Sequence, residues 1–347
     1  MELTHGGDLF GCPADTIDFS ANTNLLGMPE RVKQALSETV ALWGQYPDPL
    51  CRVLRAELSA RELLPREWIH CGNGAADLIF RLVFALRPKR ALLLAPTFSE
   101  YEQALRAVGC EIGFHPLHEK DEFAVTDKLL KQLSPALNFL VLCNPNNPTG
   151  QPIDQTLLLR IVKRCEACGI YLLVDECFLP FLEDGVQRTL KEHLEQAKHL
   201  LILQAFTKLY AMAGLRLGYL LCADSGLLER VAACGQAWNV SMPAQIAGVA
   251  ALSDLAYLEE TAWRVGSGRA WLTERLKCLG VQVIGSKANF VFFKCNQHRD
   301  LRERLLEKGI LIRSCANFRG LDARFYRVAV RDEQKNERLI EALRAVL

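Results

Sequence analysis

The sequence predicts an α/β fold: a large domain with a mostly parallel sheet flanked by helices, followed by a smaller α+β domain. Short apolar runs alternate with longer amphipathic segments through the first two thirds of the chain, a rhythm typical of βα units. After Pro243 long helical stretches replace this rhythm. With 347 residues, 50% of them hydrophobic, the chain is long enough for one large domain and one smaller one.

Five apolar runs in the first part have strand character. They are residues 91–96, 138–145, 170–176, 199–204 and 217–222. Helical signals lie between them, over 97–109 with Thr97 as cap and Gly109 as stop, and over 154–169. Ligands gather at the carboxyl ends of the strands in such sheets, so a site is expected at that edge.

The second part begins with helical residues 244–280, and strand-like runs follow at 289–295 and 309–315 with a helix between them. No repeat or extended linker separates the two parts, so we expect them to pack closely. The predicted division is an N-terminal arm that joins the small domain (residues 1–29), a large domain (30–242) and a small domain (243–347).

Charge gives no reason to expect a nucleic-acid or membrane partner. Lys plus Arg number 41 against 40 Asp plus Glu, a net charge of +1, so any anion site must be local. No apolar run reaches the length of a membrane span, and the N-terminal residues lack the basic and apolar regions of a signal peptide. A cytoplasmic protein is therefore expected.

The thirteen cysteines are predicted to be reduced thiols, because their number is odd and many lie inside apolar segments. Cys165 and Cys168 form a single CxxC. With no second pair and no nearby histidine, this pattern favours two positions on one helix face, ended by Gly169, over a zinc site. We therefore expect no metal.

Lys208 is the candidate covalent residue. It follows the apolar run 200–206, and partial burial at a strand end can lower the pKa of a lysine enough to make it a nucleophile toward an aldehyde. Arg216, eight residues on, offers a planar fork to a phosphate. Alone, such a pair is more often two solvated surface charges.

Other candidate residues also follow apolar runs. Asp175 ends one such run, and its carboxylate can pair with a protonated ring nitrogen, although helix capping is the plainer alternative. The string NPNNPTG forms an irregular turn that can hold Asn147 inward. Gly74 and Ala75 precede an apolar helix and would present N–H groups to a phosphate. Phe98 can stack on a flat ring or belong to the core.

In this order, and over nearly the whole chain, these residues resemble the aminotransferase-like fold of pyridoxal-phosphate enzymes, fold type I. The resemblance implies that Lys208 binds pyridoxal 5'-phosphate covalently and that Asp175 keeps the cofactor's ring nitrogen protonated. Asn147 would contact the ring hydroxyl, and Phe98 would stack on the ring. The residues implied to bind the cofactor phosphate are Gly74, Ala75, Thr207 and Arg216.

Tyr46 gains a role only through this resemblance. It matches a tyrosine that reaches the phosphate of the neighbouring subunit, which implies a homodimer with shared active sites. One position departs from the pattern. Ala205 stands three residues before the lysine, where relatives place Ser or Thr, so one phosphate contact is missing.

Within the family, the sequence resembles two branches, threonine-phosphate decarboxylases and histidinol-phosphate aminotransferases. Strings at 5–7, 18–29 and 311–331 favour the decarboxylases. Phe178 points the same way, because many aminotransferases carry a tyrosine there whose hydroxyl bonds the ring oxygen. The resemblance implies decarboxylation of L-threonine O-3-phosphate for cobalamin biosynthesis. Transamination of histidinol phosphate is the alternative, and an inactive fold relative that serves as a binding module is a third.

Substrate anions are expected to meet arginines near the C-terminus: Arg313, Arg324, Arg327 and Arg331. By the resemblance Arg327 binds the carboxylate, Arg313 is the first choice for the substrate phosphate, and at least one of the four forms a surface ion pair. His5 and Asn22 lie in an arm and a loop that can fold over the substrate, although His5 can equally belong to a mobile terminus.

Overall fold

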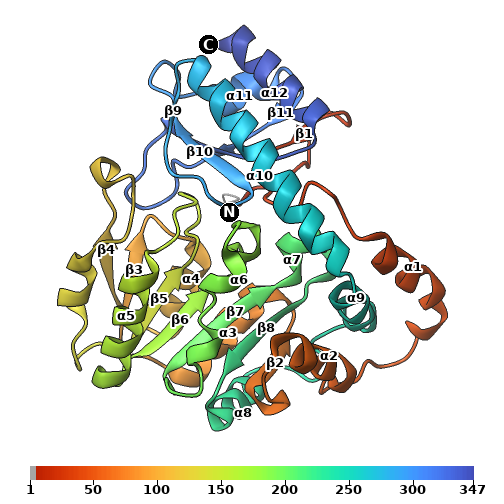
Figure 1. The fold of residues 1–347 in the computed structure, drawn as a ribbon, viewed down its shortest axis with the longest axis vertical. Coiled ribbons are helices and arrows are strands. Elements are labelled where there is room, and N and C mark those ends of the chain that lie inside the picture. Colours follow the sequence, from red (N-terminus) through yellow and green to blue (C-terminus); the bar gives the residue numbers. More distant parts are fainter. Residues whose placement is uncertain (1–4) are drawn as a thin grey trace.

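The computed structural model describes residues 5–347 and shows a helix-flanked sheet below a second, smaller α+β part (Figure 1). In the described residues the large sheet has seven strands in the order β2-β8-β7-β6-β5-β3-β4. Their bounds are β2 Ile69–Gly72, β3 Arg90–Ala95, β4 Glu111–Pro116, β5 Phe139–Cys143, β6 Tyr171–Asp175, β7 Leu200–Ala205 and β8 Gly218–Cys222.

The large sheet is mostly parallel, as predicted. Strands β4, β3, β5, β6 and β7 pair in parallel, whereas β8 runs antiparallel to both β7 and β2. The five predicted strands are all present. Because β8 is reversed, its amino end lies at the edge where the other strands have their carboxyl ends. Residues that precede β8 therefore reach the same edge as residues that follow β6 and β7.

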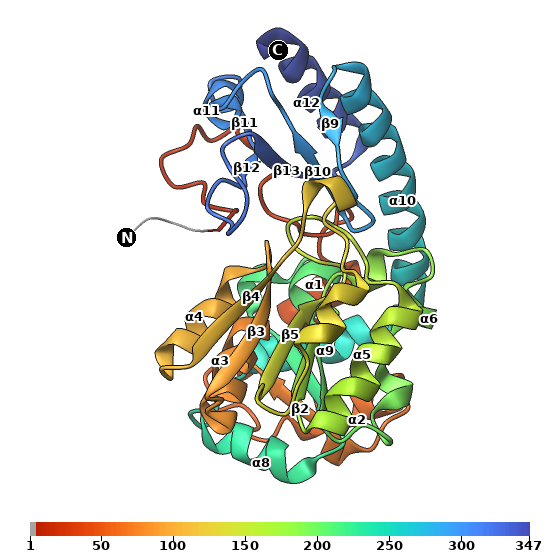
Figure 2. The same ribbon diagram turned by 90° about the vertical axis from the view of Figure 1, so that its left-hand side faces the viewer.

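Helices cover both faces of this sheet (Figures 1 and 2). One buried apolar layer includes Leu58, Ile161 and Ala247, from the helices α2 Arg52–Glu62, α5 Gln155–Cys168 and α9 Met242–Leu252. The opposite layer includes Leu82, Leu105 and Val231, from the helices α3 Gly74–Leu86, α4 Ser99–Ala107 and α8 Ser225–Ala233. Burial on both faces explains why the central strands are continuous apolar runs.

The helix α5 confirms its predicted signals. The Asp154 carboxylate accepts the N–H of Leu157 at 2.9 Å at its start, and Gly169 adopts a left-handed conformation (φ 66°) at its end. Cys165 and Cys168 are free thiols one turn apart on this helix. The pattern is thus a helical pair.

The predicted cap of α4 was wrong. The helix begins at Ser99 after Phe98, and the Thr97 hydroxyl donates to Asn146 Oδ1 at 2.9 Å. Because that oxygen belongs to a loop distant in sequence, local sequence could not reveal the competition. Gly109 stands at φ 71° just beyond the helix end, as expected for a stop.

The second part combines the C-terminal residues with the N-terminal arm. Strands β12 Arg313–Ser314, β13 Phe325–Ala329, β10 Phe290–Lys294 and β9 Gln282–Val283 form an antiparallel sheet in that order. In the arm, β1 Ile17–Asp18 pairs in parallel with β11 Ile310–Leu311. The predicted run 309–315 is therefore two short strands. The domain boundaries at residues 29 and 242 stay a prediction.

Helix α10 Leu255–Cys278 runs along one side of the molecule and connects the two parts (Figure 2). A separate apolar core joins it to the small sheet and to the arm through Leu272, Val291 and Phe19. The remaining helices are α1 Glu30–Glu38, α6 Gly185–Arg188, α7 Phe206–Leu209, α11 Leu301–Leu306 and α12 Glu333–Val346. No helix in residues 5–347 is long and apolar enough to cross a membrane.

Candidate active site

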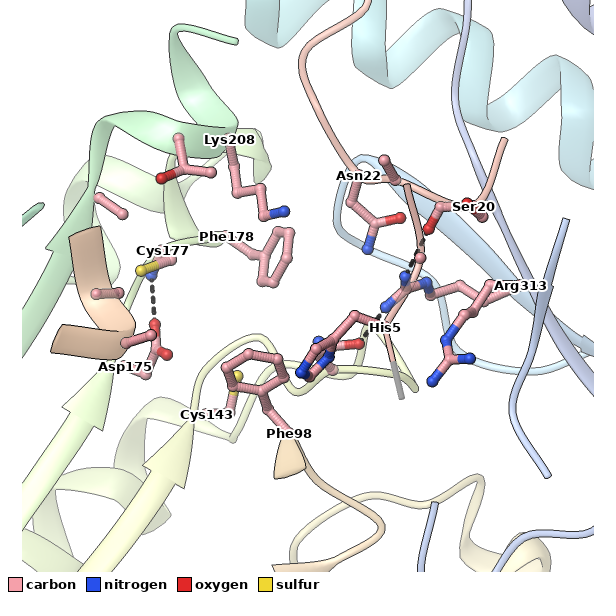
Figure 3. A pocket seen from close by; sticks show the side chains of 18 of the residues that line it. His5, Ser20, Asn22, Phe98, Cys143, Asp175, Cys177, Phe178, Lys208 and Arg313 are labelled. Carbon is pink, nitrogen blue, oxygen red and sulfur yellow. Dashed lines mark hydrogen bonds between the residues drawn. The ribbon is translucent and has the colours of Figure 1, made fainter. Parts of the chain in front are cut away.

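A cavity of about 200 Å³ lies where the carboxyl edge of the large sheet meets the N-terminal arm and the small sheet. Figure 3 shows Lys208 and Asp175 on one side of it and Asn22 and Arg313 on the other. The predicted site residues that line it are His5, Asn22, Ala75, Phe98, Asn147, Asp175, Thr207, Lys208, Arg216, Arg313 and Arg327. Residues far apart in sequence therefore meet in one pocket.

Lys208 occupies the short helix α7, directly after β7, and its amine points into the cavity (Figure 3). Burial of the amine in the cavity wall lowers its pKa from 10.5 to about 8, and the positive charge of Arg327 acts in the same direction. About a tenth of the amine is therefore uncharged at pH 7, far more than for an ordinary lysine. This is the state that attacks a carbonyl carbon.

Asp175 is the last residue of β6 and is held by donors on both oxygens. The Tyr101 hydroxyl donates to Oδ2 at 2.6 Å, and the Cys177 N–H donates to Oδ1 at 2.9 Å. Burial raises the pKa of Tyr101 well above its ordinary value, and the Asp175 charge adds to this, so the phenol stays protonated. These donors fix the direction in which the carboxylate faces the cavity.

Sequence reasoning missed Tyr101. It follows Phe98 by three residues on α4, and the two rings meet edge to face with centroids 5.6 Å apart. Phe98 lies just before α4 and Tyr101 in its first turn, so their closeness in sequence brings both rings to the same end of the helix, which was the available signal. The contact with Asp175, 74 residues away, is tertiary and has no signature in local sequence.

An anion cradle forms at the start of α3. A methyl group at Gly74 would lie 2.6 Å from Arg216 Nη2, and one at Gly218 would lie 2.9 Å from the backbone nitrogen of Ala75. Glycine at both positions therefore lets the arginine and the helix N-terminus approach each other. Thr207 adds a hydroxyl to the cavity wall, whereas Ala205 contributes a methyl group where a hydroxyl is missing. Converging N–H donors of this kind suit a phosphate.

Arg327, on β13, forms the opposite wall. Its guanidinium donates to Asn147 Oδ1 and to the carbonyl oxygen of Ser20, the latter at 2.9 Å. Burial lowers its pKa to about 10, so it remains a cation at neutral pH. Among residues 5–347, its Nε and the Oδ1 atom of Asn22 are buried without a hydrogen-bond partner. Both atoms can therefore serve a ligand.

Two further predicted residues close the rim of the cavity. The imidazole of His5 lies 2.7 Å from Glu100 Oε1, with its ring centroid 5.6 Å from that of Phe98. Arg313 donates to Asn317 Oδ1 at 2.8 Å, and its guanidinium carbon lies 5.4 Å from the centroid of the Phe318 ring. Phe318 also lines the cavity and was not predicted.

Tyr46 lies outside this cavity. Its side chain is exposed, and its ring centroid lies 4.6 Å from that of Trp238. Two of the four candidate arginines have other partners. Arg324 pairs with Asp322 at 2.5 Å, which is the surface ion pair expected of one of them. Arg331 donates to the carbonyl oxygen of Asp18 at 2.7 Å and holds the arm in place.

Family membership follows from comparison with known proteins. The profile of the family described as "Aminotransferase class I and II" matches residues 14–343. The chain therefore belongs to this family, which uses pyridoxal phosphate, so the predicted fold and cofactor are confirmed. The cavity fits that cofactor, because it combines a reactive amine, an opposing carboxylate, an aromatic face and a phosphate cradle.

Both predicted branches are represented among the relatives of the chain. The chain is 40% identical to the threonine-phosphate decarboxylase of Salmonella typhimurium, over 96% of this chain and 92% of that protein. It is 31% identical to histidinol-phosphate aminotransferase 1 of Cupriavidus pinatubonensis, over 96% of this chain and 89% of that protein. The crystal structure of the histidinol-phosphate aminotransferase from Clostridium acetobutylicum superimposes with a TM-score of 0.88 at 29% identity, covering 94% of this chain and 98% of that one.

Proposed function

We propose that this protein is a pyridoxal-phosphate-dependent decarboxylase that converts L-threonine O-3-phosphate to (R)-1-amino-2-propanol O-2-phosphate in cobalamin biosynthesis. The observation that carries the proposal is the 40% identity to a threonine-phosphate decarboxylase along nearly the whole chain, against 31% for a histidinol-phosphate aminotransferase. The reaction runs in the cytoplasm, where the thirteen cysteines stay reduced.

The cofactor would be held from both ends of the cavity. Lys208 binds it covalently, Asp175 faces its ring nitrogen, and Phe98 covers a ring face. Asn147 accepts from Arg327 through its amide oxygen, so its amide N–H groups remain for the ring hydroxyl. The N–H groups at the start of α3 and the Arg216 guanidinium would hold the cofactor phosphate. When bound, pyridoxal phosphate withdraws electrons from the substrate's α-carbon, so that a bond to this carbon can break.

The substrate's two anionic ends require two cations on the wall opposite Lys208. Arg327 would bind the carboxylate, and Arg313 would bind the substrate phosphate, since both guanidinium groups line the cavity. With both ends held, the α-carbon lies toward the Lys208 amine. The carboxylate would leave as carbon dioxide, and Lys208, displaced from the cofactor by the substrate's amine, would give a proton to the α-carbon in its place. The product amine would then leave as Lys208 bonds to the cofactor again.

Phe178 supports decarboxylation over transamination. It is buried beside Lys208 and packs edge to face on Phe290, with centroids 5.2 Å apart. A phenyl ring cannot donate the hydrogen bond that a tyrosine would give to the cofactor's ring oxygen. The electron demand on the cofactor therefore differs from that in aminotransferases that carry tyrosine at this position.

Transamination of histidinol phosphate is the second candidate. It is favoured by the TM-score of 0.88 to a histidinol-phosphate aminotransferase structure. Both reactions need the same cofactor and an anionic substrate, so the fold is compatible with either.

The protein acts as a homodimer in this proposal. Large exposed apolar side chains are concentrated between residues 40 and 53, and Trp238 adds to them through its contact with Tyr46. They are Val40, Leu42, Trp43, Tyr46, Leu50, Val53 and Trp238. Such a patch is typical of an interface. The best-matched partner is a second copy of the chain, with Tyr46 reaching the cofactor phosphate held by the other copy.

The decisive experiment incubates the cofactor-loaded protein with L-threonine O-3-phosphate and measures carbon dioxide. We expect carbon dioxide and the amine product to be released in equal amounts. The rate of release should fall about 10³-fold or more in a Lys208→Ala variant. Absence of carbon dioxide together with glutamate-dependent turnover of histidinol phosphate would instead establish the aminotransferase. Failure of the wild-type protein to bind pyridoxal phosphate would leave only a binding module.

A further inference from the structure

Asp77 lies behind the phosphate cradle, in the first turn of α3. Its Oδ2 atom accepts the backbone N–H of Asn73 at 3.0 Å, the residue that precedes the helix. The carboxylate thus satisfies a donor outside the helix. The N–H groups of Gly74 and Ala75 have no partner within a helix at this position and remain available to an anion. Asp77 therefore fixes the turn that sets their direction.

The charge of Asp77 is balanced by Arg81 one turn later. Arg81 Nε donates to Asp77 Oδ1 at 3.0 Å, and the arginine side chain is buried. Gly235 makes room for the guanidinium, because a methyl group at this position would overlap it. Pairing keeps the carboxylate from repelling a nearby phosphate and holds its orientation.

A third contact connects this network to the exposed aromatic pair. Asn239 Nδ2 donates to Asp77 Oδ2 at 3.1 Å, so one oxygen receives both Asn73 and Asn239. Trp238, the neighbour of Asn239 in sequence, has φ 54° and contacts the ring of Tyr46. The adjacent residues Trp238 and Asn239 therefore join the aromatic pair to the Asp77 carboxylate through one peptide unit.

We propose that Asp77 is a positioning residue for the cofactor phosphate, and that Asn239 couples phosphate binding to self-association through the Tyr46 and Trp238 pair. The coupling through Asn239 rests on the homodimer proposed above. The coupling is reciprocal. If dimer formation raises the affinity for the cofactor by some factor, cofactor binding must raise the association constant of the dimer by the same factor.

The first test separates a phosphate-specific effect from general damage. Dissociation constants of the apo-protein are measured for pyridoxal 5'-phosphate and for pyridoxal, which lacks the phosphate. Asp77→Ala should weaken pyridoxal phosphate about tenfold and pyridoxal less than about twofold, with Asp77→Asn between wild type and Asp77→Ala. Asp154→Ala, which removes another hydrogen bond between a carboxylate and a backbone N–H at a helix start, on α5, serves as the matched control and should leave both constants unchanged.

Equal weakening of both ligands by Asp77→Ala, or no weakening of either, overturns the positioning role. These constants are measured without substrate, so they hold whichever reaction the enzyme catalyses. If Asp77→Ala fails to fold, Asp77→Asn carries the same comparison.

The second test measures the dimer dissociation constant by sedimentation, with and without pyridoxal phosphate. In the wild type the cofactor should tighten the dimer about five- to tenfold, and in Asn239→Ala this gain should be lost. The coupling is overturned if the cofactor tightens the dimer equally in both proteins. It is also overturned if the dimer dissociation constant of the wild type does not change with the cofactor. A wild-type protein that remains monomeric overturns the coupling and the homodimer together, but leaves the result for Asp77 standing.

Discussion

At the scale of single residues, the chemistry depends on the ionisation of Lys208. Burial lowers its pKa to about 8 from 10.5. Below pH 8 the amine is mainly protonated and cannot attack a carbonyl carbon, and the uncharged fraction falls about tenfold per further pH unit. We therefore predict that capture of pyridoxal phosphate by the apo-protein accelerates up to about pH 8 and then levels off. Stopped-flow absorbance at several pH values measures this rate.

The control for this prediction is free lysine acetylated on its α-amine, so that only the side-chain amine can react. Its rate with the same cofactor should continue to rise toward about pH 10.4. The cofactor's own ionisation is common to both reactions. A protein profile that runs parallel to that of the free amine would show that the fold does not perturb Lys208.

The residues most open to prediction from sequence were those that directly follow a buried strand. Lys208 and Asp175 stand out because a charged group at the end of an apolar run needs a reason to be there. Tyr101 and Ser20 lack such a signal, since their contacts with the site come from the tertiary fold. Tyr46 could be placed only by resemblance, because within one protomer it has no contact with the cavity in the described residues.

At the scale of elements, the approach of β8 to α3 shapes the cradle. A methyl group at Gly218 would lie 2.9 Å from the nitrogen of Ala75 and 3.0 Å from the carbonyl oxygen of Gln204. Both are backbone atoms and cannot rotate away. We predict that Gly218→Ala lowers the free energy of unfolding by about 1–3 kcal/mol and weakens pyridoxal phosphate binding. Chemical denaturation and cofactor titration measure the two effects.

Gly214→Ala is the matched control. Gly214 lies four residues earlier, and no heavy atom of residues 5–347 other than its chain neighbours stands within 4 Å of its added methyl group. This variant should keep wild-type stability within about 0.5 kcal/mol and unchanged affinity. Equal behaviour of the two variants would contradict a steric role for Gly218.

Elements differed in how well sequence predicted them because they differ in burial. The strands β5 and β6 are buried on both faces and read as continuous apolar runs. The edge strand β4 alternates between exposed and partly buried residues and has only one buried residue, and β2 has only four residues, so both escaped prediction. Helix α5 was predicted over 154–169 with its end at Gly169, because the signals at both ends act within the helix itself.

At the scale of the whole molecule, the site depends on the arm and the small sheet closing over the large one. Arg327 reaches across to Asn147, and Arg331 ties the arm to β13 through the carbonyl oxygen of Asp18. These contacts span more than 150 residues of sequence, which is why the division of work among the four arginines could not be predicted. Arg313 and Arg327 line the cavity, whereas Arg324 and Arg331 do not appear among its described lining residues.

The proposed homodimer makes one further prediction, in which each active site takes Lys208 from one copy and Tyr46 from the other. Lys208→Ala and Tyr46→Ala are each expected to be severely impaired as pure proteins. In a dimer with one copy of each variant, one site carries both defects and the other carries neither. Equal mixing after dissociation and reassociation gives half mixed dimers, so activity should recover to about a quarter of the wild-type value.

The alternative arrangement gives a different result in the same experiment. If Tyr46 served the cavity of its own copy, every site in a mixed dimer would carry one defect, and mixing would restore no activity. Decarboxylation measured as carbon dioxide release distinguishes the two outcomes. A Tyr46→Phe partner provides a graded control, because it keeps the ring that contacts Trp238 and removes only the hydroxyl. If Tyr46→Phe is impaired alone but regains activity when it is mixed with Lys208→Ala, that result would assign the effect of Tyr46 to its hydroxyl rather than to loss of the interface.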